Sequence, residues 1–341
     1  MAEPGRYARQ QLYAGVGADG QEAIAGATAL IVGLGALGSA AADVLARAGV
    51  GTLRIVDRDI LELTNLQRQV LYSEDDLASG LPKAEAARRR LGAVNSEIRI
   101  EAEVLDLGPD SITRLVAGAT VVVDGTDNFE TRLLINDACL KLGVPWVYTG
   151  VIGATIHSFP VVPGDGPCFR CYLGEAPAPG SVETCDTAGV LGPAVLTAVG
   201  LGSAEALKVL AGRRDALVRG LRIVDLWSGR MSQFSLAVDP DCPACAGRYD
   251  YLEGARAIEP ARLCGRNAIQ LPGTGRPLEL ESLASSLAAH GEVKANRFLL
   301  RFQPADWPEG ELTVFRDGRR IVKGTEEVGR ARSISAKYLG A

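Results

Sequence analysis

The sequence has few histidines and no excess of positive charge. Only His157 and His290 occur in 341 residues. This count gives little support for a metal site that combines cysteine and histidine, or for a catalytic Cys/His pair. The net charge of −5 argues against general nucleic-acid binding, because proteins of that class usually present a strongly basic surface. Any metal site in this chain must draw on residues other than histidine.

The sequence also lacks an uninterrupted apolar run of the ~18–20 residues that a membrane span requires. The first ten residues, "MAEPGRYARQ", contain no apolar signal-peptide core. Hydrophobic residues nevertheless make up 47% of the chain and charged residues 23%, as in soluble proteins with a buried core. We expect a cytoplasmic protein without membrane contact, in which C-x-x-C pairs indicate metal or redox chemistry rather than disulfides.

Apolar strands alternate with helices over the first 150 residues. A strand at 29–32 leads into a Gly-rich turn and an Ala-rich helix, and further strands are predicted at 52–59, 98–106, 119–124 and 144–153. This alternation predicts an α/β fold with a doubly wound, mostly parallel, Rossmann-like sheet. A strand at 155–161 and a hairpin at 221–238 predict an antiparallel extension, with a long loop over 163–193 and a helix over 194–212.

The charge of the chain changes near residue 256. Residues 256–341 carry 14 Lys and Arg against 10 Asp and Glu, which leaves 22 against 31 for residues 1–255. A linker around "YLEGARAIEPAR" joins the two parts. The pattern after it is strand, helix, three strands and helix. We therefore predict a large domain over 1–255 and a small, basic α+β domain over 256–341.

The stretch "GLGALG" fits the pattern G-x-G-x-x-G between a strand and a helix, with glycines at 33, 35 and 38. Such glycines let the backbone turn tightly and approach a phosphate at the helix N-terminus. Asp57 ends the next predicted strand, where a carboxylate binds ribose hydroxyls. Alone, this pattern indicates an adenine nucleotide, and an NAD-linked oxidoreductase is its usual interpretation.

A cluster of polar residues then changes that interpretation. The set comprises Asp57, Asp59, Asn65, Arg68 and Gln69 in "DRDILELTNLQRQ", with Lys83 at the start of a further helix. A dinucleotide needs no such concentration, whereas a triphosphate does, because negative charge accumulates on the leaving pyrophosphate. Any one of these residues, taken singly, is as well explained as a solvated surface charge as it is as part of a binding site. Together and in this order they favour an ATP site.

The strand at 119–124 ends in "DGTDN", which contains Asp124, Asp127 and Asn128. Carboxylates at the carboxyl edge of a parallel sheet, opposite a phosphate loop, are well placed to hold Mg²⁺. The alternative is an ordinary Asx turn at Gly125. We predict Asp127 as the magnesium ligand.

The seven cysteines fall into different classes. Two C-x-x-C pairs together match a tetrahedral zinc site, and either alone would also fit a redox dithiol; their members are Cys168, Cys171, Cys242 and Cys245. Cys185 precedes a small-residue turn and a helix, whose N-terminus could lower a thiol pKa. From its residue type alone, however, Cys185 is better interpreted as a thiol without a catalytic role. Cys139 is predicted to be a core residue, and Cys264 is unassigned.

These motifs resemble those of the MoeB/ThiF family, bacterial relatives of the ubiquitin-activating enzymes. "RYARQ", "GLGALG", "DRDILELTNLQRQ", "DGTDNFETRLLIND", the two C-x-x-C pairs and "CDTAGVLGP" occur in the family's order over about residues 5–250. The resemblance implies ATP-dependent adenylylation of the C-terminal glycine of a ubiquitin-like sulfur carrier of the MoaD or ThiS type. The products would be an acyl-adenylate and pyrophosphate.

The resemblance also implies roles for single residues. Gly33, Gly35 and Asp57 would hold ATP, Asn65, Arg68 and Lys83 would contact its phosphates, and Asp127 would serve Mg²⁺. The zinc ligands would be the four cysteines of the C-x-x-C pairs. Arg9 would reach the ATP of the opposite subunit like an arginine finger, which implies a homodimer. Cys185 would trap the activated carrier or take part in sulfur transfer.

Two departures from the family pattern stand out. Ala36 replaces a glycine that many relatives have, and its methyl could crowd a backbone N–H contact, although Ala is small. Residues 256–341 do not resemble the rhodanese domain of some relatives, in which the persulfide cysteine lies between a strand and a helix. The only cysteine of this segment is Cys264, and a strand is predicted after it. This basic segment could instead dock a carrier or a sulfur donor such as a cysteine desulfurase.

Other functions compete with carrier adenylylation. An activating enzyme that conjugates a ubiquitin-like protein would require a thioester at Cys185. A non-catalytic nucleotide- or zinc-binding assembly protein is a second alternative. A dehydrogenase would bind NADH but leaves Arg68, Lys83 and Asp127 unexplained.

Overall fold

The computed structural model describes residues 5–177, 185–254, 261–263, 267–273 and 277–339; the side chains of residues 185, 186 and 261–263 lie outside this description, as do all atoms of Cys264. The chain divides into two compact units, Met1–Arg256 and Ala257–Ala341. Each unit has its own sheet and its own apolar core.

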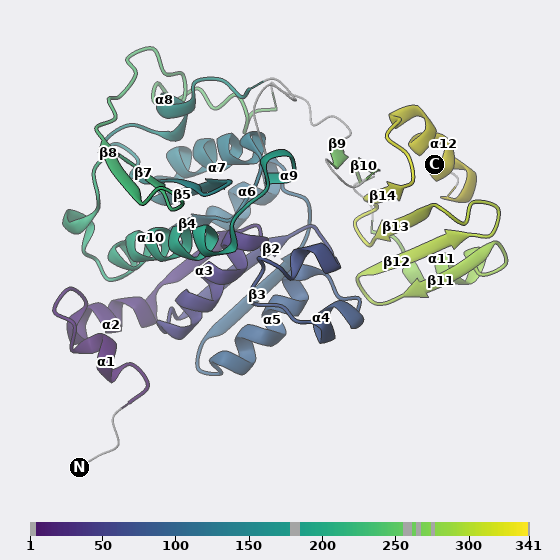
Figure 1. The fold of residues 1–341 in the computed structure, drawn as a ribbon, viewed down its shortest axis with the longest axis horizontal. Coiled ribbons are helices and arrows are strands. Elements are labelled where there is room, and N and C mark those ends of the chain that lie inside the picture. Colours follow the sequence, from purple (N-terminus) through teal and green to yellow (C-terminus); the bar gives the residue numbers. More distant parts are fainter. Residues whose placement is uncertain (1–4, 178–184, 255–260, 264–266, 274–276, 340–341) are drawn as a thin grey trace. The chain divides into compact units, whose positions relative to one another are not determined.

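The first unit contains an eight-stranded sheet in the order β3-β2-β1-β4-β5-β6-β7-β8 (Figure 1). Its strands are β1 (Thr28–Val32), β2 (Thr52–Asp57), β3 (Arg99–Val104), β4 (Val121–Asp124), β5 (Trp146–Ile152), β6 (Thr155–Val161), β7 (Leu221–Asp225) and β8 (Arg230–Phe234). The first five run parallel and the last three pair antiparallel. The predicted Rossmann-like sheet with an antiparallel extension is confirmed. Its order reverses between β1 and β4, where such sheets bind ligands.

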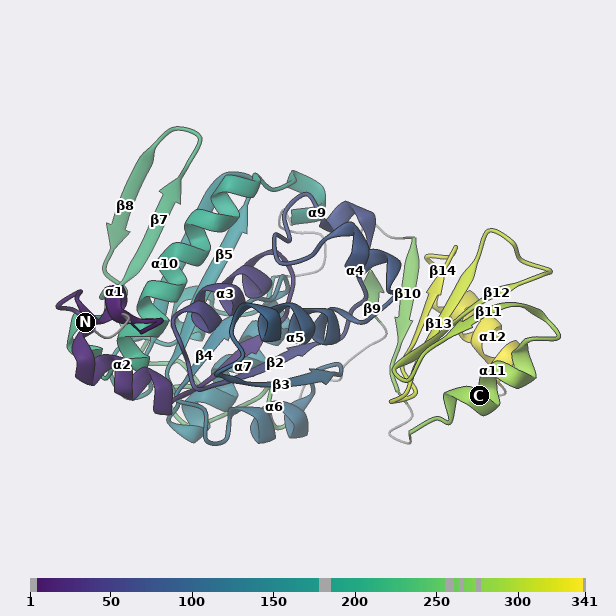
Figure 2. The same cartoon turned by 90° about the horizontal axis from the view of Figure 1, so that it is seen from below.

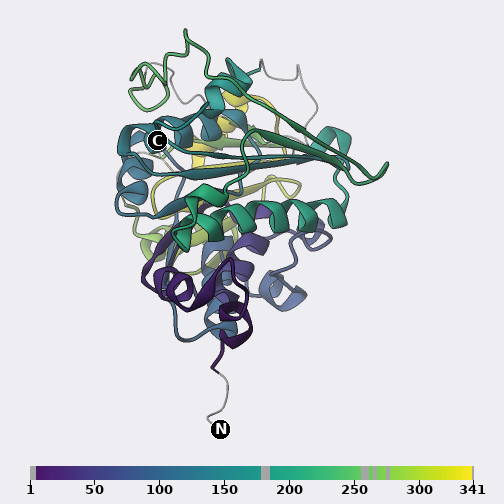
Figure 3. The ribbon, with the colours of Figure 1, turned by 90° about the vertical axis from the view of Figure 1, so that its left-hand side faces the viewer.

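Helices cover both faces of this sheet, with α3, α5 and α10 on one face and α6 and α7 on the other (Figures 1, 2 and 3). Their bounds are α3 (Ala36–Arg47), α5 (Lys83–Val94), α6 (Pro109–Val116), α7 (Phe129–Leu142) and α10 (Gly192–Leu210). The other helices of this unit are α1 (Ala8–Gln11), α2 (Gly17–Gly26), α4 (Glu74–Ala78), α8 (Phe169–Leu173) and α9 (Cys185–Ala188), with 3₁₀ turns η1 (Leu63–Asn65) and η2 (Arg214–Ala216). The prediction of an unbroken loop over 163–193 is wrong at α8 and α9, because helices this short show no 3.6-residue pattern.

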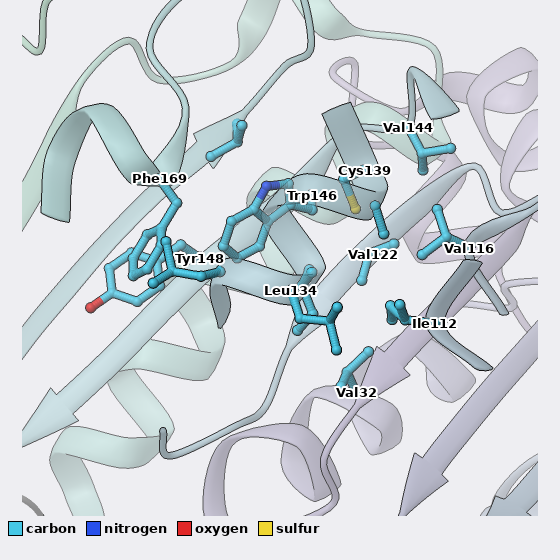
Figure 4. Close-up of a cluster of buried hydrophobic side chains, with 14 of the residues drawn as sticks. Val32, Ile112, Val116, Val122, Leu134, Cys139, Val144, Trp146, Tyr148 and Phe169 are labelled. Atoms are coloured by element: carbon cyan, nitrogen blue, oxygen red, sulfur yellow. The ribbon is translucent and has the colours of Figure 1, made fainter. Parts of the chain in front are cut away.

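One apolar core of the first unit lies between the sheet and α7 (Figure 4). Trp146 and Phe169 are both fully buried, and their rings meet edge to face with centroids 5.6 Å apart. Burying each such side chain contributes roughly 1.5–3 kcal/mol. Cys139 is buried in this core, as predicted, and burial raises the pKa of its thiol well above the usual value.

Among the described residues, α10 is long and apolar enough to cross a membrane by length and composition, and 56% of its most apolar window is buried within the protein. Its neighbours are α3, β5 and β6. These contacts account for its apolar composition, since α10 covers the sheet where the parallel strands give way to antiparallel ones.

The second unit is built on a six-stranded antiparallel sheet in the order β11-β12-β13-β14-β10-β9. Its elements are β9 (Ala261–Leu263), β10 (Ala268–Leu271), α11 (Leu280–Leu287), β11 (Gly291–Ala295), β12 (Leu299–Pro304), β13 (Glu311–Phe315), β14 (Arg320–Lys323) and α12 (Val328–Leu339). Phe302, Leu312 and Val322 meet side chains of both helices in one apolar cluster. The sequence pattern does not predict β11, an edge strand whose Glu292 and Lys294 are exposed.

Candidate active site and metal centre

The turn from β1 to α3 is packed too closely for side chains at three glycines. Gly33 has a φ of +82°, which favours glycine. A Cβ on Gly38 would lie 1.8 Å from the Gly33 carbonyl oxygen, and a Cβ on Gly125, after β4, would lie 2.5 Å from the same atom. The loop is therefore locked against the end of β4.

Helix α3 begins beside this loop without a side-chain cap. Gly35 is its N-cap residue and offers no side-chain hydrogen bond. The first N–H groups of a helix have no intrahelical partners and favour an anion. Ala36 occupies the first helical position, where the backbone suits any L residue, so the departure from glycine leaves the loop's conformation intact.

Asp57 braces the glycine loop from the end of β2. Its carboxylate accepts hydrogen bonds from the backbone N–H of Leu34 and of Asp59, each at 2.6 Å. Burial raises the pKa of Asp57, while the nearby Lys83 ammonium opposes that rise. The predicted ribose ligand thus already orients the loop on which the phosphates would rest.

Lys83 and Asp59 form an ion pair at the same edge. The Lys83 side chain is only 4% exposed, and its Nζ lies 3.4 Å from Oδ2 of Asp59. Tyr72 closes this corner, because its hydroxyl donates to the Leu34 carbonyl at 3.0 Å. No sequence pattern pointed to Tyr72, which lies between η1 and α4.

The segment around η1 supplies three further predicted residues. Asn65 is buried, and its side-chain oxygen accepts from the backbone N–H of Glu62 at 3.0 Å. Gln69 is buried beside Gly35, and its Oε1 has no hydrogen-bond partner within the described part of the chain. Arg68 is half-buried and donates to the Thr64 carbonyl at 3.1 Å. Gln69 therefore brings a buried, unsatisfied acceptor to the phosphate loop.

The two aspartates at the end of β4 lie in different environments, since one is buried and ion-paired and the other is exposed. Asp124 is buried and pairs with the Arg132 guanidinium at 3.1 Å, although burial raises its pKa. Asn128 caps α7 by accepting from the Thr131 N–H at 2.8 Å. Asp127 is exposed, and in the described ranges no hydrogen bond or ion pair reaches its carboxylate. Of this group, Asp127 is the residue available to a ligand.

The four cysteines of the two C-x-x-C pairs converge on one point. All four Sγ atoms lie within 4.8 Å of one another, and neighbouring sulfurs are 3.5 to 3.8 Å apart. A zinc tetrahedron with Zn–S bonds of about 2.3 Å places its sulfurs roughly 3.8 Å apart. None of the four is in a disulfide. The donor set and spacing fit Zn²⁺.

The metal site joins two segments distant in sequence. Cys168 and Cys171 flank the start of α8, whereas Cys242 and Cys245 lie in the loop after β8. That loop also docks on α7, where Asp137 accepts from the Tyr251 N–H at 3.0 Å. Burial raises the pKa of Asp137 to about 6. The site thus pins the β8 loop to the core.

Arg9 lies at the end of the sheet opposite the glycine loop. Its neighbour Gln10 donates to the Ala48 carbonyl, at the C-terminal end of α3, at 3.0 Å. A 12-residue helix is about 18 Å long. Arg9 is exposed, and none of the described residues pairs with it. It therefore lies far from the glycine loop of its own chain.

Cys185 begins α9, and its side chain lies outside the described residues. The segment that follows α9 is attached to the sheet, since the Gly153 N–H donates to the Gly189 carbonyl at 3.0 Å. It leads into α10, where a Cβ on Gly192 would lie 3.7 Å from the Gln67 carbonyl oxygen. The start of α10 thus adjoins the residues that follow η1.

Comparisons with known proteins agree with this arrangement. The model of the ThiF family matches residues 7–244. A sulfur carrier protein ThiS adenylyltransferase of Bacillus subtilis is 42% identical over 342 residues, which cover 98% of this chain and 99% of that protein. A sulfur carrier protein adenylyltransferase of Thermus thermophilus is 38% identical over 70% of this chain and 90% of its own length. The crystal structure of E. coli MccB with ATP has the same fold, with a TM-score of 0.63 at 23% identity over 72% of this chain and 74% of that one.

Proposed function

This chain belongs to the ThiF family, and we propose that it adenylylates the C-terminal glycine of a small ubiquitin-like sulfur carrier protein. Its named relatives are adenylyltransferases, and it is accordingly a nucleotidyltransferase. One observation carries the proposal: the Lys83–Asp59 pair, the uncapped start of α3 and the exposed Asp127 follow the carboxyl ends of the neighbouring strands β2, β1 and β4.

In the proposed reaction a carboxylate oxygen of the carrier attacks the α-phosphorus of ATP. The bond from that phosphorus to the bridging oxygen breaks, and pyrophosphate leaves with the bonding electrons. The backbone N–H groups at the start of α3 bind phosphate oxygens. Lys83 and Arg68 neutralise the charge that develops on the leaving group, and Asp59 holds Lys83 in position.

The remaining predicted residues take supporting roles. Asp57 accepts hydrogen bonds from the ribose hydroxyls with lone pairs not used by the loop. Asn65 contacts the phosphates, and Gln69 lies beside the loop. Asp127 would hold Mg²⁺, since an exposed carboxylate at this edge provides the oxygen ligand that the ion prefers. When bound, Mg²⁺ supplies positive charge between the phosphates.

Sulfur transfer would follow adenylylation. The acyl-adenylate is open to attack by a thiolate or persulfide, which displaces AMP. Cys185 is the proposed nucleophile of this chain, supported by its place in the segment that leads into α10, whose first residue Gly192 lies beside Gln67. A cysteine desulfurase is the class of partner that could supply the sulfur.

Carrier-dependent exchange of labelled pyrophosphate into ATP tests the proposed reaction. We expect exchange that requires a carrier ending in Gly-Gly, and Asp127→Ala should lower its rate by about 100-fold. Asp165→Ala is the matched control, because Asp165 pairs with Arg219 on a surface turn and should leave the rate unchanged. If ATP binds but no such carrier supports exchange, the proposed function is wrong.

We propose that residues 256–341 dock the carrier or the sulfur donor through their net charge of +4. The Thermus relative, which aligns with only 70% of this chain, supports the view that adenylylation itself does not need this segment. A chain ending at residue 255 should keep its exchange kcat within about twofold, while its KM for the carrier rises about fivefold. At about 0.5 M salt, where the Debye length is roughly 4 Å, the two chains should converge. Equal KM values at low salt would refute carrier docking.

A further inference from the structure

Arg58 lies at the nucleotide edge of the sheet but was not among the predicted site residues. It follows Asp57 directly. Its Nη1 donates to Oδ1 of Asp106 at 3.1 Å, and its Nε lies 3.9 Å from Oδ1 of Asp59. The side chain is 31% exposed. One hydrogen bond and one ion pair thus orient the guanidinium, while part of the side chain remains accessible to a ligand.

The surroundings of Arg58 place it toward one side of the site. Asp106 follows β3, and the strand order is β3-β2-β1-β4. Burial by itself lowers the pKa of Arg58, but Asp106, Asp59 and, more weakly, Asp127 raise it overall. The guanidinium therefore stays charged, and Asp106, to which it donates, lies just beyond the carboxyl end of β3.

The path of a bound nucleotide follows from the same strand order. Phosphates on the start of α3 lie beyond β1, and a ribose on Asp57 lies beyond β2. The base must then continue toward β3, where Asp106 holds Arg58. Because two carboxylates already neutralise Arg58, it is a poor phosphate ligand, yet its planar group can still stack on an aromatic ring.

We propose that Arg58 stacks its guanidinium on the base of the bound nucleotide, as a specificity-determining residue that favours a purine. Asp106 is its positioning residue. The inference rests on the proposed function only in taking ATP as the ligand. The sequence signal is an arginine between two aspartates, "DRD", which composition alone cannot distinguish from a solvated charge.

Equilibrium binding without any carrier tests this inference. We expect Arg58→Ala to weaken binding of ATP and of AMP by the same factor, about tenfold, and to leave pyrophosphate binding unchanged. The ratio of ATP affinity to CTP affinity should be smaller in Arg58→Ala than in the wild type. Arg58→Lys, which keeps the charge but not the plane, should lose part of this affinity, as should Asp106→Asn. Lys83→Ala is the contrasting variant, since it should weaken pyrophosphate binding.

Several results would overturn the role of Arg58. They are unchanged AMP affinity in Arg58→Ala, or a parallel loss of pyrophosphate affinity, which would indicate a phosphate contact. Thermal melting of each variant checks its fold, and Arg58→Lys provides a second measurement if Arg58→Ala melts early. Wild-type protein that binds ATP and AMP but catalyses no exchange would overturn the proposed function alone. Wild-type protein that binds neither nucleotide would overturn both.

Discussion

Replacing Cys242 with alanine should abolish zinc binding and destabilise the first unit by several kcal/mol. The upper limit is the free energy with which structural sites bind Zn²⁺, ~10–16 kcal/mol. Metal analysis of the purified protein should find one zinc per wild-type chain and essentially none in the variant. Denaturant unfolding should show the loss of stability, and chelation of the wild type should reproduce it.

The physical reason is the cost of burying thiolates without a cation. Cys168 and Cys242 are both buried, and burial raises the pKa of the Cys168 thiol far above its usual value. A metal ion is what holds such thiolates ionised. With three ligands the site binds metal much more weakly, and the loop after β8 loses its attachment beside α8.

Cys139→Ala is the matched control for this effect. Cys139 is also a buried cysteine next to the same core, but it is not part of the sulfur cluster. Its replacement should cost about 1 kcal/mol through a small cavity and leave the zinc content at one. Full zinc content in Cys242→Ala, or equal stability of the two variants, would contradict a structural metal site.

The parts of the site predictable from sequence are those set by local geometry. "GLGALG" predicts its loop because Gly33 must adopt a positive φ and Gly38 must pass close to it. The C-x-x-C pairs predict their cluster because two knuckles supply four ligands, whatever separates them. Strand alternation predicts the sheet, because period and handedness leave few topologies.

The parts that sequence did not predict depend on contacts between distant segments. Tyr72 belongs to the site only because its hydroxyl reaches Leu34. Arg58 belongs to it because Asp106, 48 residues later, holds it. Asp124 and Asp127 look alike in "DGTDN", and only Arg132 separates the buried structural carboxylate from the exposed one. Such distinctions require the fold.

Mixing two inactive variants should restore activity if Arg9 serves the opposite subunit of a homodimer. We expect Arg9→Ala to lower the exchange rate by about 10³-fold, as loss of an arginine finger does, and Asp127→Ala also to be nearly inactive. After subunit exchange, about half of the dimers are mixed, and each contains one site with both residues intact. Activity should therefore recover to about one quarter of wild type.

The geometry favours this outcome because Arg9 cannot reach the site of its own chain. The contact of Gln10 with Ala48 holds α1 at the far end of α3, about 18 Å from the glycine loop. Lys83→Ala mixed with Asp127→Ala is the control, since both residues serve one site within one subunit and every mixed dimer keeps two defective sites. Recovery in the control, or none with Arg9→Ala, would rule out donation across the dimer. Recovery in the mixture that contains Arg9→Ala, without recovery in the control mixture, would establish that each active site is built from residues of both chains.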